Sequence, residues 1–145
     1  MSDSFQVHPI GWIRKKDHAV RIDIDPAFQD GLVGLEGFSH IIVCYWFHEN
    51  DNPDDRRRLQ VHPMKNPSNP LTGVFATHAP VRPNLLGLST CRVVSVTGTT
   101  IHIDAIDARN ETPVIDIKGY LPDKLDPSEI RLPDWLIADD RFEKR

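Results

Sequence analysis

Hydrophobic residues recur at every second position along most of this chain. The alternation is clearest at residues 20–25, which read Val-Arg-Ile-Asp-Ile-Asp. A period of two places successive side chains on opposite faces of a β-strand, whereas an amphipathic helix needs a period of 3.6. The pattern therefore predicts an all-β domain. Strands are expected at residues 5–13, 20–25, 38–47, 59–63, 74–77, 88–96, 100–106 and 113–118.

Three local signals refine this prediction. Residues 38–47 are apolar on both faces, which predicts a central strand buried on both sides. Residues 88–96 and 100–106 flank Thr97-Gly98-Thr99, which predicts a β-hairpin. Asp25 and Pro26 suit the cap and the first position of a short helical turn. Because closure removes exposed strand edges, we expect a small closed or nearly closed β-barrel of about seven strands with short helical turns.

One loop, residues 73–89, combines apolar residues with candidate chemistry. Pro80 and Pro83 remove two backbone donors and fix φ at about −65°, so this loop is neither helix nor central strand. Between and beside them stand Arg82 and Asn84. A stiff loop with these side chains suits a small charged ligand.

Composition sets the class of protein. The chain has 145 residues, of which 39% are hydrophobic and 26% charged, values typical of one globular domain. Its net charge of −4 gives no global attraction for nucleic acid, so such a partner would need a local basic patch. No apolar run is long enough for a transmembrane helix, and no secretion signal is visible. Cys44 and Cys91 lie in apolar strands, so we expect buried thiols in a cytoplasmic protein.

The composition changes after Leu121, where prolines and charged residues become frequent. We therefore expect a barrel domain over residues 1–122 and a C-terminal tail over residues 123–145. The tail contains one apolar island, Trp135-Leu-Ile137. Such an island is typical of a segment that docks on its own barrel or on a partner subunit.

Three segments together resemble one family. Residues 35–50 resemble a strand of this family that ends in His-Glu. Residues 73–89 resemble the family's loop, which usually reads Phe-Ala-Thr-Arg-Ser-Pro-x-Arg-Pro-Asn-Pro-Ile-Gly. Residues 107–122 resemble its closing motif, which usually reads Asp-Gly-Thr-Pro-Val-Leu-Asp-Ile-Lys-Pro-Tyr. This is the TrmO family, also called TsaA-like, and the resemblance covers roughly residues 7–122. It implies a small β-barrel that binds S-adenosylmethionine at a site completed by the second subunit of a homodimer. The characterised members methylate N6 of threonylcarbamoyl-adenosine beside the tRNA anticodon.

The resemblance also implies roles for individual residues. Because a poor nitrogen nucleophile needs a base within hydrogen-bond reach, Asp116 and Glu49 are the candidate bases. The implied set comprises cofactor contacts from His48, Glu49, His78, Arg82, Asn84, Leu88, Thr112 and Pro113, catalytic roles for Asp116, Lys118 and Glu49, and substrate contacts from Tyr120 and Lys118.

Several of these residues have a simpler structural interpretation. Arg82 can hold a carboxylate or phosphate through its planar fork, or it can tie its own loop to neighbouring carbonyls. Asp116 and Lys118 stand two apart on one strand face and can form a surface ion pair. Asn84 can brace the loop. The seven histidines show no close pairing of the zinc-motif kind, so no metal is expected.

The chain also departs from the family pattern. His78 and Ala79 stand where the family has Arg and Ser, and Glu111 replaces the Gly of Asp-Gly-Thr-Pro. A loop between the first two strands and a longer C-terminal domain are missing from this sequence. The resemblance therefore supports the cofactor more firmly than the substrate.

Three functions follow from these observations. The first is methylation of modified adenosine in tRNA, the second is methylation of a small molecule on the same fold, and the third is cofactor binding without catalysis. A basic strip near the barrel mouth, from residues 14–16 and 56–58, would favour tRNA.

Overall fold

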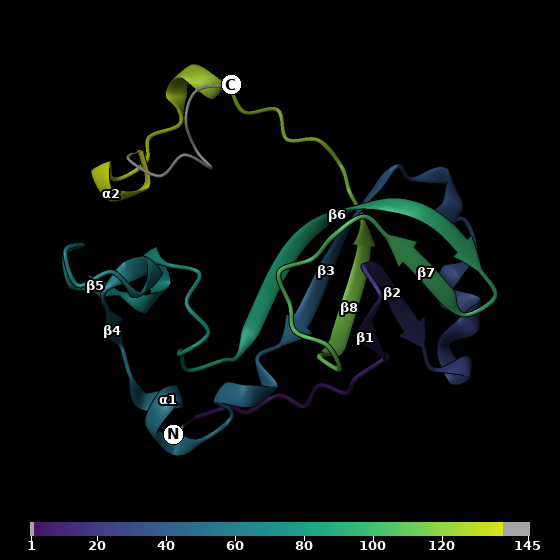
Figure 1. The fold of residues 1–145 in the computed structure, drawn as a ribbon, viewed down its shortest axis with the longest axis horizontal. Coiled ribbons are helices and arrows are strands. Elements are labelled where there is room, and N and C mark those ends of the chain that lie inside the picture. Colours follow the sequence, from purple (N-terminus) through teal and green to yellow (C-terminus); the bar gives the residue numbers. More distant parts are fainter. Residues whose placement is uncertain (1, 138–145) are drawn as a thin grey trace.

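The computed structural model describes residues 2–137 and contains a closed antiparallel β-barrel (Figure 1). Six strands form the barrel in the order β1-β2-β7-β6-β3-β8, and β4 and β5 form a separate two-stranded sheet. The expected closed barrel is confirmed. The strands are β1 Gly11–Lys16, β2 Ala19–Ile24, β3 His40–Trp46, β4 Gln60–Val61, β5 Thr72–Gly73, β6 Leu86–Thr97, β7 Thr100–Ile103 and β8 Pro113–Gly119.

The helical elements are short and occupy the connections. The α-helices are α1 Pro53–Arg57 and α2 Asp134–Ile137, and the 3-10 turns are η1 Pro26–Leu32, η2 Leu35–Gly37, η3 His48–Asn50, η4 Pro63–Lys65, η5 Val74–Ala76 and η6 Pro127–Glu129. The expected cap is present, since the Asp25 side chain accepts a hydrogen bond from the Ala27 N–H and Pro26 opens η1. None of the helices within residues 2–137 has the length and apolar character needed to cross a membrane.

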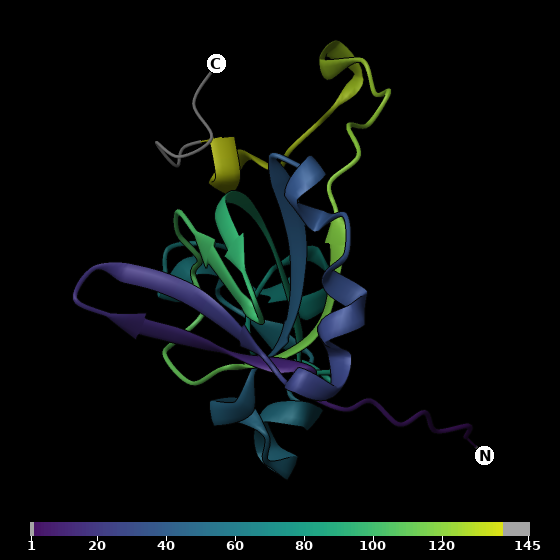
Figure 2. The same cartoon turned by 90° about the vertical axis from the view of Figure 1, so that its right-hand side faces the viewer.

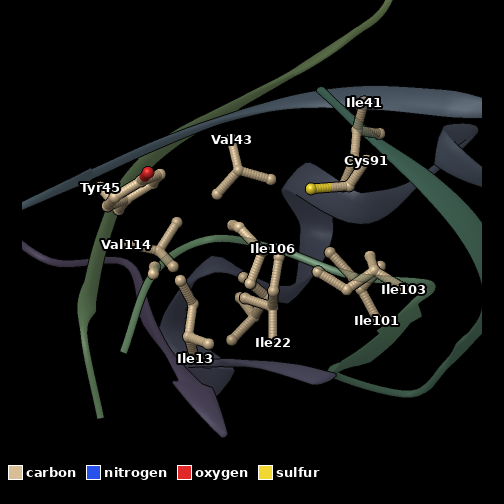
Figure 3. Close-up of a cluster of buried hydrophobic side chains, with 12 residues drawn as sticks. Ile13, Ile22, Ile41, Val43, Tyr45, Cys91, Ile101, Ile103, Ile106 and Val114 are labelled. Atoms are coloured by element: carbon tan, nitrogen blue, oxygen red, sulfur yellow. The ribbon is translucent and has the colours of Figure 1, made fainter. Parts of the chain in front are cut away.

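The core lies inside the barrel, where each of the six barrel strands contributes buried residues, mostly aliphatic, with Cys91 from β6 (Figure 3). The alternation that predicted the strands is the reason, because one face of each strand points inward. Fully buried members are Ile13, Ile22, Ile41, Val43, Ile101 and Val114.

Tight turns join the hairpins. Asp17 and His18 both have positive φ, 52° and 66°, between β1 and β2, and this suits a two-residue turn that follows the strand twist. Gly98, with φ of 60°, forms the predicted turn between β6 and β7. That hairpin is confirmed.

Residues 5–10 and 74–77 are not strands as predicted, and the strands predicted over residues 59–63 and 100–106 are shorter, at Gln60–Val61 and Thr100–Ile103. The first strand begins at Gly11 rather than residue 5, and Phe5 is 90% exposed. Only glycine fits at position 11, because an added Cβ would lie 2.4 Å from the Asp23 carbonyl oxygen. Residues 74–77 were expected as a strand, but Val74–Ala76 is a 3-10 turn, because Thr77 donates from both N–H and Oγ to the Val74 carbonyl.

Strand β3 is buried on one face only. Its inward residues Ile41, Val43 and Tyr45 are buried, whereas Ile42, Cys44 and Trp46 on the outer face are half-buried. The prediction of a strand buried on both faces is therefore wrong for the isolated chain. Cys44 and Cys91 are both free thiols, as expected, but only Cys91 is buried, whereas Cys44 is half-buried.

A lobe of residues 48–85 stands beside the barrel and contains α1, β4 and β5 (Figure 1). It leaves the barrel at the end of β3 and returns at the start of β6. The tail beyond β8 is largely exposed up to residue 134, and Trp135 and Leu136 in α2 are half-buried (Figure 2). The predicted docking of the tail stays a prediction, and its residues 138–145 lie outside the described chain.

Candidate functional site

A cleft of about 1230 Å³ opens between the mouth of the barrel and the lobe. Three parts of the chain line it. They are the end of β3 with η3, the lobe, and the segment of residues 104–112 between β7 and β8, which we call the β7–β8 segment. The cleft thus forms where residues distant in sequence converge, as is usual for ligand sites.

The lining is basic although the chain as a whole is acidic. Four cationic and two anionic side chains line the cleft, together with three histidines. The lining therefore carries a surplus of positive charge, whereas the whole chain carries −4. These residues are Arg58, Lys65, Arg82 and Arg109, Glu49 and Asp107, and His48, His62 and His78.

The structure brings six of the predicted residues to this cleft. They come from all three sequence segments that resemble the family. The six are His48, Glu49, His78, Arg82, Leu88 and Thr112.

Arg82 is tied to its own loop. Its Nη1 donates to the carbonyl oxygens of Thr77, at 3.2 Å, and Ala79, at 2.9 Å. These contacts match the structural interpretation of Arg82. Its Nε and Nη2 have no protein partner within the described chain, and the residue lines the cleft. One side chain can therefore stiffen the loop and still offer donors to a ligand.

Thr112 sets the shape of the turn that enters β8. It is 3% exposed, its N–H donates to the Arg109 carbonyl, and its own carbonyl accepts from the Ile13 N–H at 2.9 Å. The preceding residue, Glu111, has a positive φ of 67°. The family's Gly stands at this position, so Glu111 adopts the left-handed conformation that glycine favours.

An ion pair crosses the mouth of the cleft. Glu49 Oε2 lies 2.9 Å from Arg109 Nε, and both side chains are exposed. The pair joins η3 to the β7–β8 segment. Arg109 was not among the predicted site residues.

A buried tyrosine forms part of the barrel end of the cleft. Tyr45 is 5% exposed, and its hydroxyl lies 3.2 Å from Ser89 Oγ. Its ring meets Phe47 edge to face, with 5.6 Å between the ring centroids. Burial raises the pKa of Tyr45, the hydrogen bond with Ser89 opposes this rise, and the Asp107 carboxylate adds to it.

The other predicted residues do not line the cleft. Asp116 and Lys118 lie on the outer face of β8, where Lys118 Nζ is 3.5 Å from Asp116 Oδ2. Asp116 pairs with Cys44, which also pairs with Leu88, so Asp116 and Leu88 lie two strands apart across the sheet. Tyr120 packs against His40 at the start of β3.

Asn84 and Pro113 lie outside the cleft lining as well. Asn84 is exposed, and its carbonyl accepts from the Leu86 N–H at 2.8 Å. Pro113 is the first residue of β8. Five predicted residues therefore lie outside the cleft lining, and their catalytic and binding roles stay predictions. They are Asn84, Pro113, Asp116, Lys118 and Tyr120.

The basic residues considered for a strip are divided. Arg58 lines the large cleft, whereas Lys15 and Lys16 line a separate shallow depression beside the β1–β2 turn. Arg14 forms ion pairs with carboxylates of Asp23 and Glu111. The cleft instead collects its positive charge from residues of the lobe and the β7–β8 segment.

Sequence reasoning considered Arg58 only as part of a possible basic strip, and it gave Lys65, Arg109 and Asp107 no role. Asp107 stands at the first position of a segment that resembles the family motif, which was the available signal. Over the described residues 2–137, no three His, Cys, Asp or Glu side chains gather to hold a metal ion.

Comparison with known proteins agrees with the barrel fold and identifies a family. Residues 5–126 match the model of the tRNA-methyltransferase O N-terminal domain family. A probable S-adenosyl-L-methionine-binding protein of Pyrococcus horikoshii is 47% identical over 124 residues, which are 86% of this chain and 88% of that protein.

Two further similarities concern longer proteins. The human tRNA (adenine(37)-N6)-methyltransferase is 36% identical over 105 residues, 72% of this chain and 23% of that enzyme. The crystal structure of TrmO from Pseudomonas aeruginosa superposes with a TM-score of 0.70 at 27% identity, covering 93% of this chain and 63% of that one.

Proposed function

This chain belongs to the tRNA-methyltransferase O N-terminal domain family, and we propose that it binds S-adenosylmethionine in the cleft between barrel and lobe. The single observation that carries the proposal is the convergence of three family-like segments on one basic cleft. The Pyrococcus relative, named for binding this compound, supports it.

The lining fits the chemistry of the cofactor. The cleft, at about 1230 Å³, is larger than the roughly 300–1,000 Å³ of ordinary small-ligand pockets. An amino acid carboxylate needs cationic or N–H donors, which Arg82 and His78 supply, and the adenosine needs an apolar wall, which Leu88 supplies. Leu88 is 66% exposed, so the wall is open at this point.

Arg82 would orient the carboxylate of the cofactor. Its Nη1 is held by the Thr77 and Ala79 carbonyls, so the guanidinium is fixed before any ligand arrives. A donor fixed in advance loses little entropy on binding. His78 stands four residues away in the same loop and lines the cleft, where a ring N–H would add a second donor.

When bound, S-adenosylmethionine supplies an electrophilic methyl group on a positively charged sulfur. The residues of this chain would contribute mainly by position, because a good leaving group leaves orientation as the main requirement. The Glu49–Arg109 pair would hold η3 and the β7–β8 segment together across the ligand.

We propose further that the acceptor is N6 of threonylcarbamoyl-adenosine in tRNA. The human relative, named as a tRNA adenine methyltransferase, supports this acceptor. The surplus of positive charge in the cleft lining is consistent with a polyanionic substrate. The match covers under a quarter of that enzyme, so its substrate is carried over to this chain only as a proposal.

A cofactor-binding module without catalysis is the second candidate. The name of the Pyrococcus relative, which mentions binding only, favours it. A small-molecule acceptor is the third, favoured by the acidic charge of the whole chain.

A homodimer would explain how predicted site residues that lie outside the cleft of their own chain could still take part in a site. The outer face of β6, β3 and β8 carries Leu88, Cys44 and Asp116 side by side. A second copy against this face would bring Asp116 and Lys118 toward a cleft rim. We propose such a dimer, in which Asp116 or Glu49 acts as base and Tyr120 contacts substrate.

Calorimetric titration and a methyl-transfer assay test the proposal in sequence. We expect the chain to bind S-adenosylmethionine and to methylate an anticodon stem-loop carrying threonylcarbamoyl-adenosine, but not the same stem-loop with plain adenosine. Binding with no transfer to either RNA would favour the cofactor-binding module. Absence of binding by a folded chain would contradict the proposed site.

A further inference from the structure

One carboxylate of the cleft forms no ion pair or hydrogen bond with any residue from 2 to 137. Glu49 and Asp107 are the two acidic residues of the lining, and Glu49 is neutralised by Arg109 at 2.9 Å. Asp107 makes no hydrogen bond or ion pair with any residue in the range 2–137 that the structure describes. An unpaired carboxylate in an otherwise basic cleft is suited to a positive group of the ligand.

Asp107 lies between two buried residues of the β7–β8 segment. Its neighbours Ile106 and Ala108 are 8% and 4% exposed and belong to the core, whereas Asp107 itself is exposed. Asp107, exposed between these two buried residues, lines the cleft. Lys15 secures the segment from outside, since its Nζ donates to the Ile106 carbonyl at 2.6 Å.

Aromatic side chains line the same end of the cleft. The rings of Tyr45 and Phe47 meet edge to face and both line the cleft. Asp107 lies close enough to Tyr45 for its charge to raise the pKa of the phenol, after burial, which has the larger effect. Aromatic rings beside a carboxylate form the environment that stabilises an organic cation.

The lobe side of the cleft offers donors for a negative group. His62, Lys65 and Arg82 belong to the lobe, so a ligand carboxylate would bind there. The cofactor's ammonium shares a carbon atom with its carboxylate and would remain near the lobe. The sulfonium lies further along the molecule and would reach the barrel mouth.

We propose that Asp107 is the counter-ion of the cofactor's sulfonium and thereby sets the preference for S-adenosylmethionine over S-adenosylhomocysteine. This inference rests on the proposed cofactor site. S-adenosylhomocysteine lacks one methyl group and carries no charge on sulfur, so Asp107 would hold the charged compound and not the neutral one. Selection of this kind would also limit inhibition by the demethylated product.

Calorimetric titration of Asp107→Asn with three ligands tests this role without any activity assay. The ligands are S-adenosylmethionine, S-adenosylhomocysteine and sinefungin, which carries a protonated amine at the position of the methylated sulfur. We expect the substitution to weaken binding of the two charged ligands about tenfold and that of S-adenosylhomocysteine less than twofold.

Asp30→Asn is the matched control, because Asp30 is an exposed aspartate on η1, outside the cleft lining, and the substitution makes the same charge change. It should leave all three affinities unchanged. Retained affinity for S-adenosylhomocysteine in Asp107→Asn would itself show that the cleft is folded.

Equal loss for all three ligands, or no loss for any, would overturn the role of Asp107 and leave the cofactor site intact. If the unaltered chain bound none of the ligands, the proposed function would fail and the role of Asp107 with it. The two failures are therefore distinguishable.

Discussion

Glu49 and Arg109 meet across the cleft, with 2.9 Å between Oε2 and Nε, although 60 positions separate them in the sequence. The pair connects the segment that follows β3 with the segment that precedes β8. Because both ends of the pair belong to the cleft lining, its effect should be visible in ligand binding more than in folding.

We predict that Arg109→Gln lowers the free energy of unfolding by less than about 1 kcal/mol, because the pair is exposed to solvent. The same change should weaken S-adenosylmethionine binding, since η3 and the β7–β8 segment lose their connection. Urea denaturation and calorimetric titration measure the two effects. The exposed pair Arg57–Asp54, 2.8 Å apart and outside the cleft, is the control. Equal effects of Arg57→Gln on binding would argue against the bridging role.

Arg82→Ala should affect both stability and binding. Loss of its two hydrogen bonds to the Thr77 and Ala79 carbonyls should cost about 1–3 kcal/mol of unfolding free energy. Cofactor affinity should fall as well, because the loop loses its brace and the ligand loses a cationic donor. Chemical denaturation and titration of the same preparation separate the two contributions. Unchanged affinity with reduced stability would assign Arg82 a structural role alone.

Gly87→Ala should disturb the aromatic end of the cleft. An added Cβ would come within 2.6 Å of the Tyr45 ring and 2.8 Å of the Phe47 ring. Such overpacking costs about 1–3 kcal/mol, and the displaced rings should reduce cofactor affinity.

Gly119→Ala provides the comparison for this prediction, because its Cβ would come within 2.7 Å of the Phe38 ring, away from the cleft. It should destabilise the barrel to a similar extent and leave binding unchanged. The prediction fails if both variants lose affinity equally.

Stability should decline as pH rises from about 9 to about 11, partly through Cys91. Burial raises the pKa of this thiol from 9.0 to about 11, with the Asp104 carboxylate adding to the rise. Above pH 9 the unfolded chain loses this proton while the folded chain keeps it, so deprotonation favours unfolding. The stabilisation is complete below pH 9 and disappears as pH passes 11. Denaturation of Cys91→Ala at several pH values should show a shallower decline than the unaltered chain, and an equally steep decline would contradict this origin.

The strands could be predicted from the sequence because one face of each is buried. Ile22 and Ile24 alternate with polar residues, and both are buried. The same alternation misled the prediction at residues 5–10, since a period of two does not show whether a partner strand lies alongside. At Val74, hydrogen bonds from Thr77 close a turn that apolar character alone does not reveal.

The site was predictable only in part, for a geometric reason. His48, Arg82 and Thr112 belong to motifs that resemble a known family, so their position could be transferred. Arg58 and Lys65 reach the cleft because the lobe folds back beside the barrel mouth, and no local pattern encodes that arrangement. Asp116 and Lys118 belong to the third motif, but they lie on the outer face of β8 and do not line the cleft of their own chain. The sequence does not show which face of the barrel a motif residue occupies relative to the cleft.

The central claim is that S-adenosylmethionine binds in the cleft between barrel and lobe, and NMR shift mapping of the backbone amides tests it most directly. We predict that the largest ligand-induced shifts fall at residues 48–50, 77–82 and 107–112, which lie around the cleft. The turn at Asp17 and His18, beside the separate shallow depression, should change little. Shifts concentrated at that turn, or no shifts at saturating ligand, would contradict the assignment of the site.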